Sequence, residues 1–115
     1  MSFVRADVVL ARLNPNQGAE IGKIRPVVVL TATPLIAAGL PVVMVVPLTT
    51  QFWPELAALR VEIPPRERLL KTSYVVLEQT RSIDKNRIQS DVITRLTQPE
   101  LTEIESKLKL MLGFA

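Results

Sequence analysis

Short apolar runs, separated by polar stretches rich in glycine and proline, characterise the first 96 residues of the chain. Runs of roughly four to eight apolar residues, many of them valine, are typical of β-strands. We therefore expect strands within residues 3–13, 25–31, 42–49, 56–64 and 74–83, and a strand or extended segment over 87–96. The segment 31–41 is expected to form a helical or turn-like tip between the second and third strands.

The hydrophobic period changes after residue 96. Apolar residues then recur every three or four positions, at Leu101, Ile104, Leu108 and Met111. This spacing places them on one face of a helix, which we expect to pack against the core. Thr97 and Glu100 fit the pattern of a helix capping box, and Gly113 is suited to end the helix.

Together these elements predict a mainly β fold with one C-terminal α-helix. The 115 residues are enough for one hydrophobic core, so we expect a single domain spanning residues 1–115. Several short strands with one helix favour a small, strongly curved sheet or barrel over a doubly wound α/β sheet.

Composition narrows the expected class of protein and its compartment. Hydrophobic residues make up 48% of the chain, which favours a packed globular domain over a disordered one. The sequence has no apolar run near the roughly 20 residues that a membrane-spanning helix needs, and its N-terminus lacks the pattern of a secretory signal. Because there is no cysteine for disulfides either, we expect a cytoplasmic protein.

Charge and the lack of histidine restrict the chemistry further. Fourteen lysine and arginine residues against 11 acidic residues give a net charge of +3, a mild excess that suits a polyanion such as nucleic acid. The chain has no histidine and no cysteine, so it lacks the commonest general acid–base and the commonest metal ligands. We expect no metal site and no cofactor, and catalysis that uses carboxylates, hydroxyls, lysine or arginine.

Polar residues stand at the ends of several predicted strands. Arg25 directly precedes Pro26, whose ring holds Arg25 in an extended conformation. Thr49 ends the third strand, and Glu78 and Arg81 lie toward the end of the fifth. Side chains at the ends of neighbouring strands can converge, which would unite a hydroxyl, a carboxylate and two guanidinium groups.

Such a group of side chains suits a phosphodiester of RNA. Arginine forks match phosphate oxygens and stabilise the added negative charge of a transition state. A carboxylate can accept the proton of a ribose 2′-OH, so that this oxygen attacks the adjacent phosphate without a metal ion. The products would be a 2′,3′-cyclic phosphate and a 5′-OH, and DNA, which lacks the 2′-OH, would not be cut.

Structural roles are equally open for the same residues. Arg25 could be a solvated strand end or the partner of a salt bridge, and Thr49 an ordinary strand-end residue. Glu78 could form an ion pair with Arg81. The aromatic pair at residues 52–53 could cover the core or offer a surface on which RNA bases stack.

Four segments of the chain carry a family resemblance. They are the first strand with Asp7, "LNPNQGAEIGKIRPVVVL" (13–30), "VVPLTT" (45–50) and "SYVVLEQTRSIDKNRI" (73–88). In this order, and followed by a terminal helix, they resemble the MazF/PemK toxins of bacterial type II toxin–antitoxin systems over nearly the whole chain.

The resemblance implies a small SH3-like β-barrel of five to seven short strands with a C-terminal α-helix, assembled as a homodimer. It implies a metal-independent, sequence-specific endoribonuclease that cuts single-stranded RNA, chiefly mRNA. It also implies a cognate antitoxin protein as a partner, which we expect to be acidic and partly disordered.

The roles of individual residues are implied by the matching motifs. The catalytic arginine falls on Arg25, the catalytic threonine on Thr49, and the acidic residue that acts as base in some members on Glu78. The positions expected to bind RNA are Gln17, Glu20, Lys23, Thr50, Gln79, Arg81 and Lys85.

Three positions depart from the family pattern. Ala6 stands in place of the usual glycine before the first acidic residue. Ala19 and Val76 stand where one branch of the family has a loop histidine and a strand arginine. The acid and base assignments of that branch therefore do not transfer to this chain, and the general acid is unassigned.

Two other functions are compatible with the same kind of barrel. One is a non-catalytic toxin that inhibits DNA gyrase, and the other is a plain RNA-binding module. A gyrase inhibitor has no need of a phosphodiester site, so the presence of Arg25, Thr49 and Glu78 together favours the ribonuclease.

Overall fold

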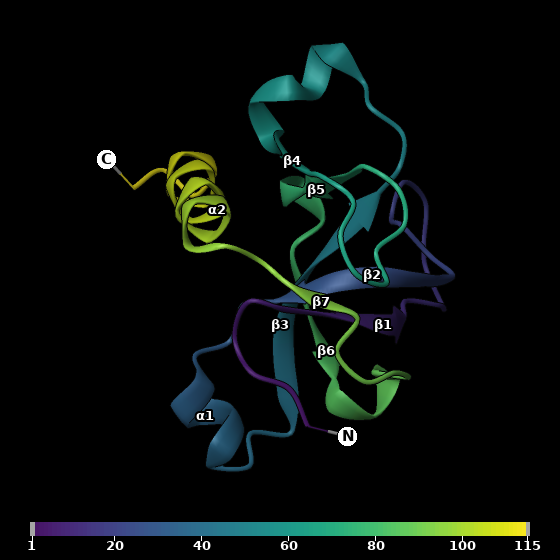
Figure 1. Ribbon diagram of the computed structural model, residues 1–115, viewed down its shortest axis with the longest axis vertical. Helices are drawn as coiled ribbons and strands as arrows, with labels where there is room; N and C mark the ends of the chain where they lie inside the picture. The colour runs from purple at the N-terminus through teal and green to yellow at the C-terminus, as the bar shows by residue number, and fades with distance from the viewer. Residues whose placement is uncertain (1, 115) are drawn as a thin grey trace.

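The computed structural model describes residues 2–114, and Figure 1 shows its secondary structure. In chain order, the elements are β1 (Asp7–Arg12), β2 (Ile24–Val29), α1 (Thr33–Ala37), β3 (Val42–Thr49), the 3₁₀ helix η1 (Pro54–Leu59), β4 (Arg60–Ile63), β5 (Ser73–Val76), the 3₁₀ helix η2 (Leu77–Gln79), β6 (Arg81–Asp84), the 3₁₀ helix η3 (Lys85–Arg87), β7 (Thr94–Arg95) and α2 (Gln98–Met111).

Within residues 2–114, the strands form one curled antiparallel sheet of seven strands. Its order is β4-β5-β3-β2-β1-β7, and β6 also pairs with β3. The sheet closes partway into a half-barrel, with α2 beside β4 and β5, and with α1 and the N-terminus at the opposite end (Figure 1). The prediction of a small, strongly curved β-barrel with a C-terminal helix is confirmed.

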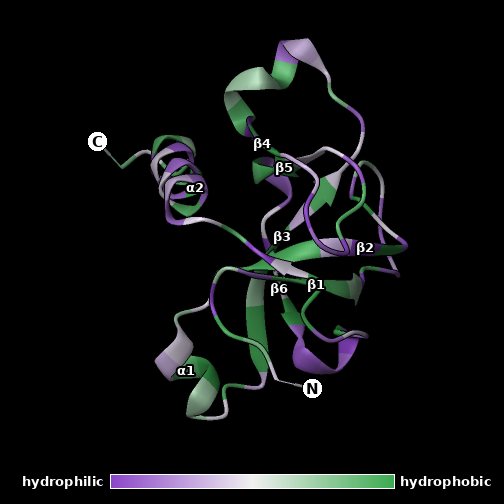
Figure 2. Ribbon diagram, in the orientation of Figure 1, coloured by the Kyte–Doolittle hydropathy of each residue, from purple (hydrophilic) through white to green (hydrophobic). Residues whose placement is uncertain are grey.

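The sheet carries one hydrophobic cluster on each of its faces. Side chains alternate along a strand, so neighbours such as Val8 and Val9 belong to different clusters. The first cluster is closed by α2 through Leu101 and Ile104, and the second contains Ile83 of β6. Burial on both faces explains why β2 and β3 are continuous apolar runs rather than alternating ones (Figure 2).

The C-terminal helix begins and packs as its sequence predicts. The Thr97 hydroxyl accepts from the Glu100 N–H, and the Glu100 carboxylate accepts from the Thr97 N–H, which completes the capping box. Both carboxylate oxygens of Glu100 also accept from the guanidinium of Arg66, which ties the helix to the connector after β4. The apolar stripe fades toward the C-terminus, where Met111 is 36% exposed.

The segment 74–83, expected as one strand, is two strands separated by η2. From Val45 to Leu48, β3 advances three residues, while its partner advances six, from Arg81 back to Val75. Three residues are therefore surplus to the pairing, and they form the 3₁₀ turn at Leu77–Gln79. This bulge pushes the side chains of η2 away from the ladder of hydrogen bonds.

Other boundaries also differ from the expected ones. The segment 56–64 begins within η1 and becomes a strand only at Arg60. The segment 87–96 contains the last residue of η3, an isolated bridge at Ile88 and the two residues of β7. Within residues 2–114, we find no helix long and apolar enough to cross a membrane.

Candidate active site

Arg25 and Thr49 lie on one face of the sheet. The last paired residues of β2 and β3 are Val27 and Pro47, and if the register is continued by two residues along each strand, Arg25 falls opposite Thr49. Because side chains two residues apart share a face, the guanidinium and the hydroxyl emerge on the same side. Both residues are half-buried.

Each of these two side chains has a local hydrogen bond that holds it. The Arg25 Nε donates to the carbonyl oxygen of Gly22 at 3.1 Å, which leaves the two terminal nitrogens of the guanidinium for a ligand. The Thr49 hydroxyl accepts from the N–H of Gln51 at 3.2 Å, which leaves its own proton available for donation.

Aromatic side chains continue this face beyond Thr49. Tyr74 of β5 pairs directly with Thr49, and Phe52 packs on Tyr74 with ring centroids 4.9 Å apart. Phe52 is 45% exposed and Trp53 is 54% exposed, so the rings do not form a closed lid over the core. Exposed rings next to a polar cluster suit the stacking of unpaired bases.

Glu78 in η2 is engaged by an arginine, but not by Arg81. Its two carboxylate oxygens accept from the two terminal nitrogens of Arg60, at 2.6 and 2.9 Å. Arg60 is only 8% exposed, whereas the Glu78 side chain is 32% exposed. The alternative of an ion pair between Glu78 and Arg81 is not what the structure shows.

The Arg60 guanidinium also governs the ionisation of Glu78. Burial raises the pKa of the Glu78 carboxyl, but the hydrogen bonds from Arg60, a backbone hydrogen bond and the charge of Arg60 outweigh it. The net effect lowers the pKa of Glu78 below its ordinary value, so the carboxylate is charged at neutral pH.

Arg60 was not anticipated as a site residue. In the sequence it alternates with apolar neighbours, a pattern typical of a solvated strand face. Its burial follows from the pairing of β4 with β5, in which Arg60 lies opposite Val76, next to η2. No local signal reveals this register, because β4 has only four residues.

Gln79 and Arg81 hold the loop 14–23 against η2. The Gln79 amide donates to the carbonyl oxygen of Ala19 at 3.1 Å and accepts from the N–H of Ile21 at 3.3 Å. Arg81 donates to the carbonyl oxygen of Leu13 at 3.3 Å. The long loop is therefore fixed at its start and near its middle.

The loop also has internal hydrogen bonds that involve the predicted RNA-binding residues. The Glu20 carboxylate accepts from the N–H of Gln17 at 2.7 Å, and the N–H of Lys23 donates to the Asn14 side chain at 2.9 Å. Between the loop and η2 lies a hollow of about 360 Å³, lined by Ala19, Glu20, Glu78, Gln79, Thr80 and Arg81.

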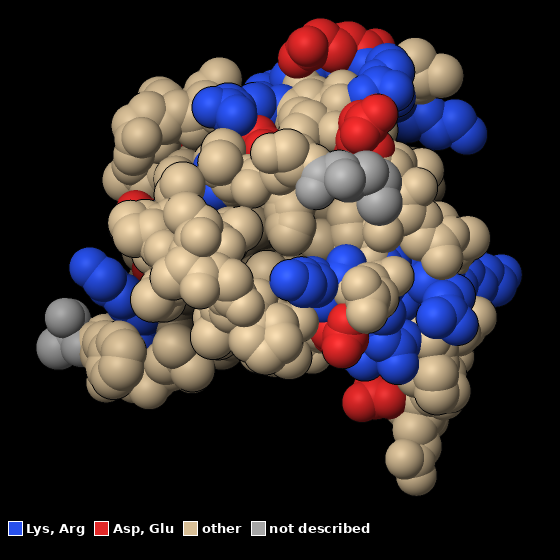
Figure 3. Space-filling model, turned by 90° about the horizontal axis from the view of Figure 1, so that it is seen from below, with Lys and Arg blue, Asp and Glu red and all other residues tan. Residues whose placement is uncertain are grey.

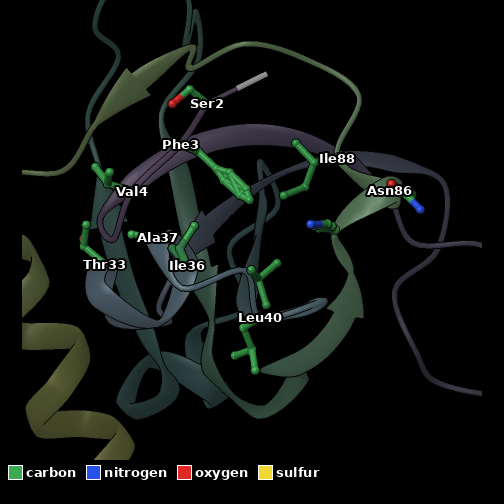
Figure 4. A pocket seen from close by; sticks show the side chains of 11 residues that line it. Ser2, Phe3, Val4, Thr33, Ile36, Ala37, Leu40, Asn86 and Ile88 are labelled. Atoms are coloured by element: carbon green, nitrogen blue, oxygen red, sulfur yellow. The ribbon is translucent and has the colours of Figure 1, made fainter.

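Lys85 lies apart from the other candidate residues. It follows β6, where Asp84 pairs with Val42, and is therefore at the opposite end of β3 from Thr49. There it lines a larger cavity of about 560 Å³, into which Phe3 and Ile36 project (Figure 4). The structure does not bring Lys85 to the cluster around Arg25.

Charge on the surface is mixed rather than uniformly basic. Figure 3 shows lysine and arginine side chains gathered along parts of one face, with acidic side chains among them. Within residues 2–114 there is no group of three or more acidic, histidine or cysteine residues placed to hold a metal ion.

Comparison with known proteins identifies the family. The family model described as "PemK-like, MazF-like toxin of type II toxin-antitoxin system" matches residues 4–112. The chain belongs to this family. An Endoribonuclease MazF of Staphylococcus saprophyticus subsp. saprophyticus is 36% identical over 110 residues, which cover 95% of this chain and 90% of the relative.

Solved MazF structures share the fold. MazF from Deinococcus radiodurans superposes with a TM-score of 0.81 at 21% identity, with 98% of each chain covered. An endoribonuclease in complex with its cognate antitoxin, from a mycobacterial species, has a TM-score of 0.78 at 19% identity, covering 99% of this chain and 98% of the other. At such low sequence identities, these superpositions support a shared fold but do not assign roles to individual side chains.

Proposed function

We propose that this PemK/MazF toxin is a metal-independent endoribonuclease that cuts single-stranded RNA, chiefly mRNA, at specific sequences. The observation that carries the proposal is the register of β2 with β3, which, continued two residues beyond Val27 and Pro47, directs Arg25 and Thr49 to one sheet face, together with Glu78 in the turn that follows β5. Its second support is the relative at 36% identity that is named an endoribonuclease.

In this mechanism the substrate supplies its own nucleophile. The 2′-oxygen attacks the adjacent phosphorus, its proton passes to the Glu78 carboxylate, and the P–O5′ bond breaks. The 5′-oxygen takes a proton from water and leaves as a 5′-OH, while the other fragment retains a 2′,3′-cyclic phosphate. Every atom in this step comes from RNA, water or the side chain of Glu78.

Arg25 and Thr49 would stabilise the phosphate in this step. The two free terminal nitrogens of Arg25 suit two phosphate oxygens, and Pro26 stiffens the backbone that presents them. The hydroxyl proton of Thr49 suits a third oxygen. Preorganised donors of this kind stabilise the extra negative charge of the transition state at no cost of reorganisation.

Binding of the RNA strand is assigned to the residues around this cluster. Gln17, Glu20, Lys23, Gln79 and Arg81 belong to or contact the loop 14–23, and Thr50 follows Thr49 directly. Lys85 would meet only a more distant part of a bound strand, because it lies at the other end of β3.

We also propose that the toxin acts as a single domain that forms a homodimer and binds a cognate antitoxin. Large apolar side chains are exposed at the end of α2, among them Leu110, Leu112 and Phe114, and such surface is commonly covered in an assembly. An acidic antitoxin peptide would compete with RNA for Arg25 and Lys23.

The test is incubation of the purified protein with a long single-stranded RNA in EDTA, followed by mapping of the new ends. We expect discrete cuts that leave 2′,3′-cyclic phosphate and 5′-OH ends, and a loss of at least a hundredfold in rate for Arg25→Ala. Lys109→Ala, which removes an exposed charge on α2, should cut as the unmodified protein does.

Two results would contradict the proposal. A folded Arg25→Ala variant that cuts at the original rate would remove Arg25 from the mechanism. A folded protein that cuts none of several RNAs but inhibits supercoiling by purified gyrase would favour the gyrase-inhibitor alternative.

A further inference from the structure

Arg60 and Glu78 form a forked ion pair in which the arginine is buried and the carboxylate is partly exposed. Arg60 is only 8% exposed, and its Nε has no hydrogen-bond partner among the described residues. Burial of a guanidinium costs free energy, and an unpaired N–H adds to that cost. The pair is therefore a poor device for stability, and its clear effect is on the carboxylate of Glu78.

The fork of Arg60 fixes where the Glu78 carboxylate points. Two parallel hydrogen bonds, at 2.6 and 2.9 Å, define both the position and the plane of the carboxylate. They use one lone pair on each oxygen and leave the others free to accept a proton. Because the Glu78 side chain is 32% exposed, this free side can be reached by a substrate.

Arg60 is itself held from two directions. Its NH1 donates to the carbonyl oxygen of Leu59 at 3.0 Å, and its own carbonyl oxygen accepts from Nζ of Lys107 on α2 at 2.7 Å. In the pairing of β4 with β5, Arg60 lies opposite Val76, an apolar residue. The fork is therefore anchored to β4 and to the C-terminal helix.

We propose that Arg60 is a positioning residue of the RNA-cleaving site, which orients the Glu78 carboxylate so that it can accept the 2′-OH proton. This inference rests on the proposed ribonuclease function. Arg60 acts through Glu78 and need not touch the RNA.

Arg60 is the charged residue that is paired with Glu78. The surrounding elements carry these charged residues: Arg60 and Glu62 of β4, Glu20 and Lys23 of the loop, Arg81 and Asp84 of β6, and Glu100, Glu103, Glu105, Lys107 and Lys109 of α2. Among these, only Arg60 is within salt-bridge distance of the Glu78 carboxylate. Removal of its charge should therefore dominate any change in the ionisation of Glu78.

The experiment compares four variants with the unmodified protein: Arg60→Gln, Arg60→Lys, Glu78→Gln and the double variant Arg60→Gln/Glu78→Gln. For each protein, kcat is measured as a function of pH on a short RNA that contains one mapped cut site. We expect Arg60→Gln to lower kcat roughly tenfold or more at neutral pH, and to move the acid limb of the profile to higher pH. The loss should therefore grow as the pH falls. Arg60→Lys should restore the position of the limb, because it keeps the charge, but not the full kcat, because it lacks the fork.

Arg66→Gln is the matched control, since it breaks another forked arginine–glutamate pair, at Glu100, far along the chain from η2. It should lower the melting temperature and leave the pH profile unchanged. A titration of the Glu78 carboxyl by ¹³C NMR in the absence of RNA gives a readout that does not depend on cleavage. It should show Glu78 titrating at higher pH in Arg60→Gln than in the unmodified protein.

The double variant distinguishes positioning from mere structural support. If Arg60 acts through Glu78, the double variant should cut no more slowly than Glu78→Gln alone, even if Arg60→Gln by itself fails to fold. An additional loss in the double variant, or an unchanged NMR titration of Glu78 in folded Arg60→Gln, would overturn the inference. An unmodified protein that cuts no RNA would instead overturn the proposed function.

Discussion

At the scale of single residues, the candidate site combines three groups that strand-end reasoning can find, Arg25, Thr49 and Glu78, with one that it cannot, Arg60. Arg25 and Thr49 stand in the sequence at the ends of two apolar runs, so their common face follows once the two strands pair. The partner of Glu78 could not be foreseen. It depends on the register of a four-residue strand, and a shift of one residue would turn Arg60 to the other face.

The hydroxyl of Thr49 gives a prediction at this scale. Thr49→Val keeps the shape of the side chain and removes the proton that would be donated to a phosphate oxygen. We expect kcat for RNA cleavage to fall about a hundredfold, with little change in KM, because one preorganised donor to the transition state is lost.

The control for this variant is Thr102→Val, which removes an exposed hydroxyl on α2. It should leave kcat unchanged. Equal cleavage by Thr49→Val and the unmodified protein, both with intact circular dichroism spectra, would show that the hydroxyl takes no part in the reaction.

At the scale of elements, the regular parts of the fold are the ones that local pattern predicts. The third strand occupies residues 42–49 as expected, and the helix begins after Thr97 because capping box and apolar period agree. The break between β5 and β6 was missed, since residues 77–79 are no less compatible with a strand than their neighbours. It arises because three residues along β3, from Val45 to Leu48, pair with a segment that advances six residues, from Arg81 back to Val75.

Glu100 provides a prediction for the helix. Burial raises the pKa of its carboxyl, but hydrogen bonds from Arg66 and Thr97 lower it by more, so the net pKa lies below the ordinary value. A carboxyl with a lowered folded-state pKa stabilises the fold above its unfolded pKa, and this contribution is lost as the pH falls through the folded value. We expect Glu100→Gln to reduce the free energy of unfolding by about 2 kcal/mol at pH 7.

Urea unfolding at a series of pH values checks this prediction. The difference between Glu100→Gln and the unmodified protein should be largest at neutral pH and should close in acid. Glu103→Gln, which breaks the exposed pair with Lys107, should differ little at any pH. A difference for Glu100→Gln that persists undiminished below its folded-state pKa would contradict the argument.

At the scale of the whole molecule, charge is nearly balanced. Fourteen basic residues face 11 acidic ones, and several arginines are already paired with carboxylates. Affinity for RNA must therefore come from a few local contacts rather than from a strongly basic surface. Besides Arg60, which is paired with Glu78, the cations named at the candidate site are Lys23, Arg25 and Arg81.

If Lys23, Arg25 and Arg81 each contact one phosphate, the affinity for RNA should depend only modestly on salt concentration. We expect the logarithm of the association constant to fall with the logarithm of salt concentration with a slope of about −2. Binding is measured on an RNA whose cut site carries a 2′-deoxyribose, so that the unmodified protein cannot cleave it. Lys23→Ala should make the slope shallower by about 0.7, as expected for the loss of one phosphate contact. A slope unaffected by that substitution would exclude a phosphate contact at Lys23.

The hydrophobic cluster closed by α2 joins the two ends of the chain, since Val8 from the first strand packs in the same cluster as Leu101 and Ile104. A ribosome makes the N-terminal end first, so this core stays incomplete until Leu101 and Ile104 have emerged. A nascent chain would thus keep this face of its sheet uncovered until α2 had been made. A chain that stops before Leu101 would lack the residues that close this cluster.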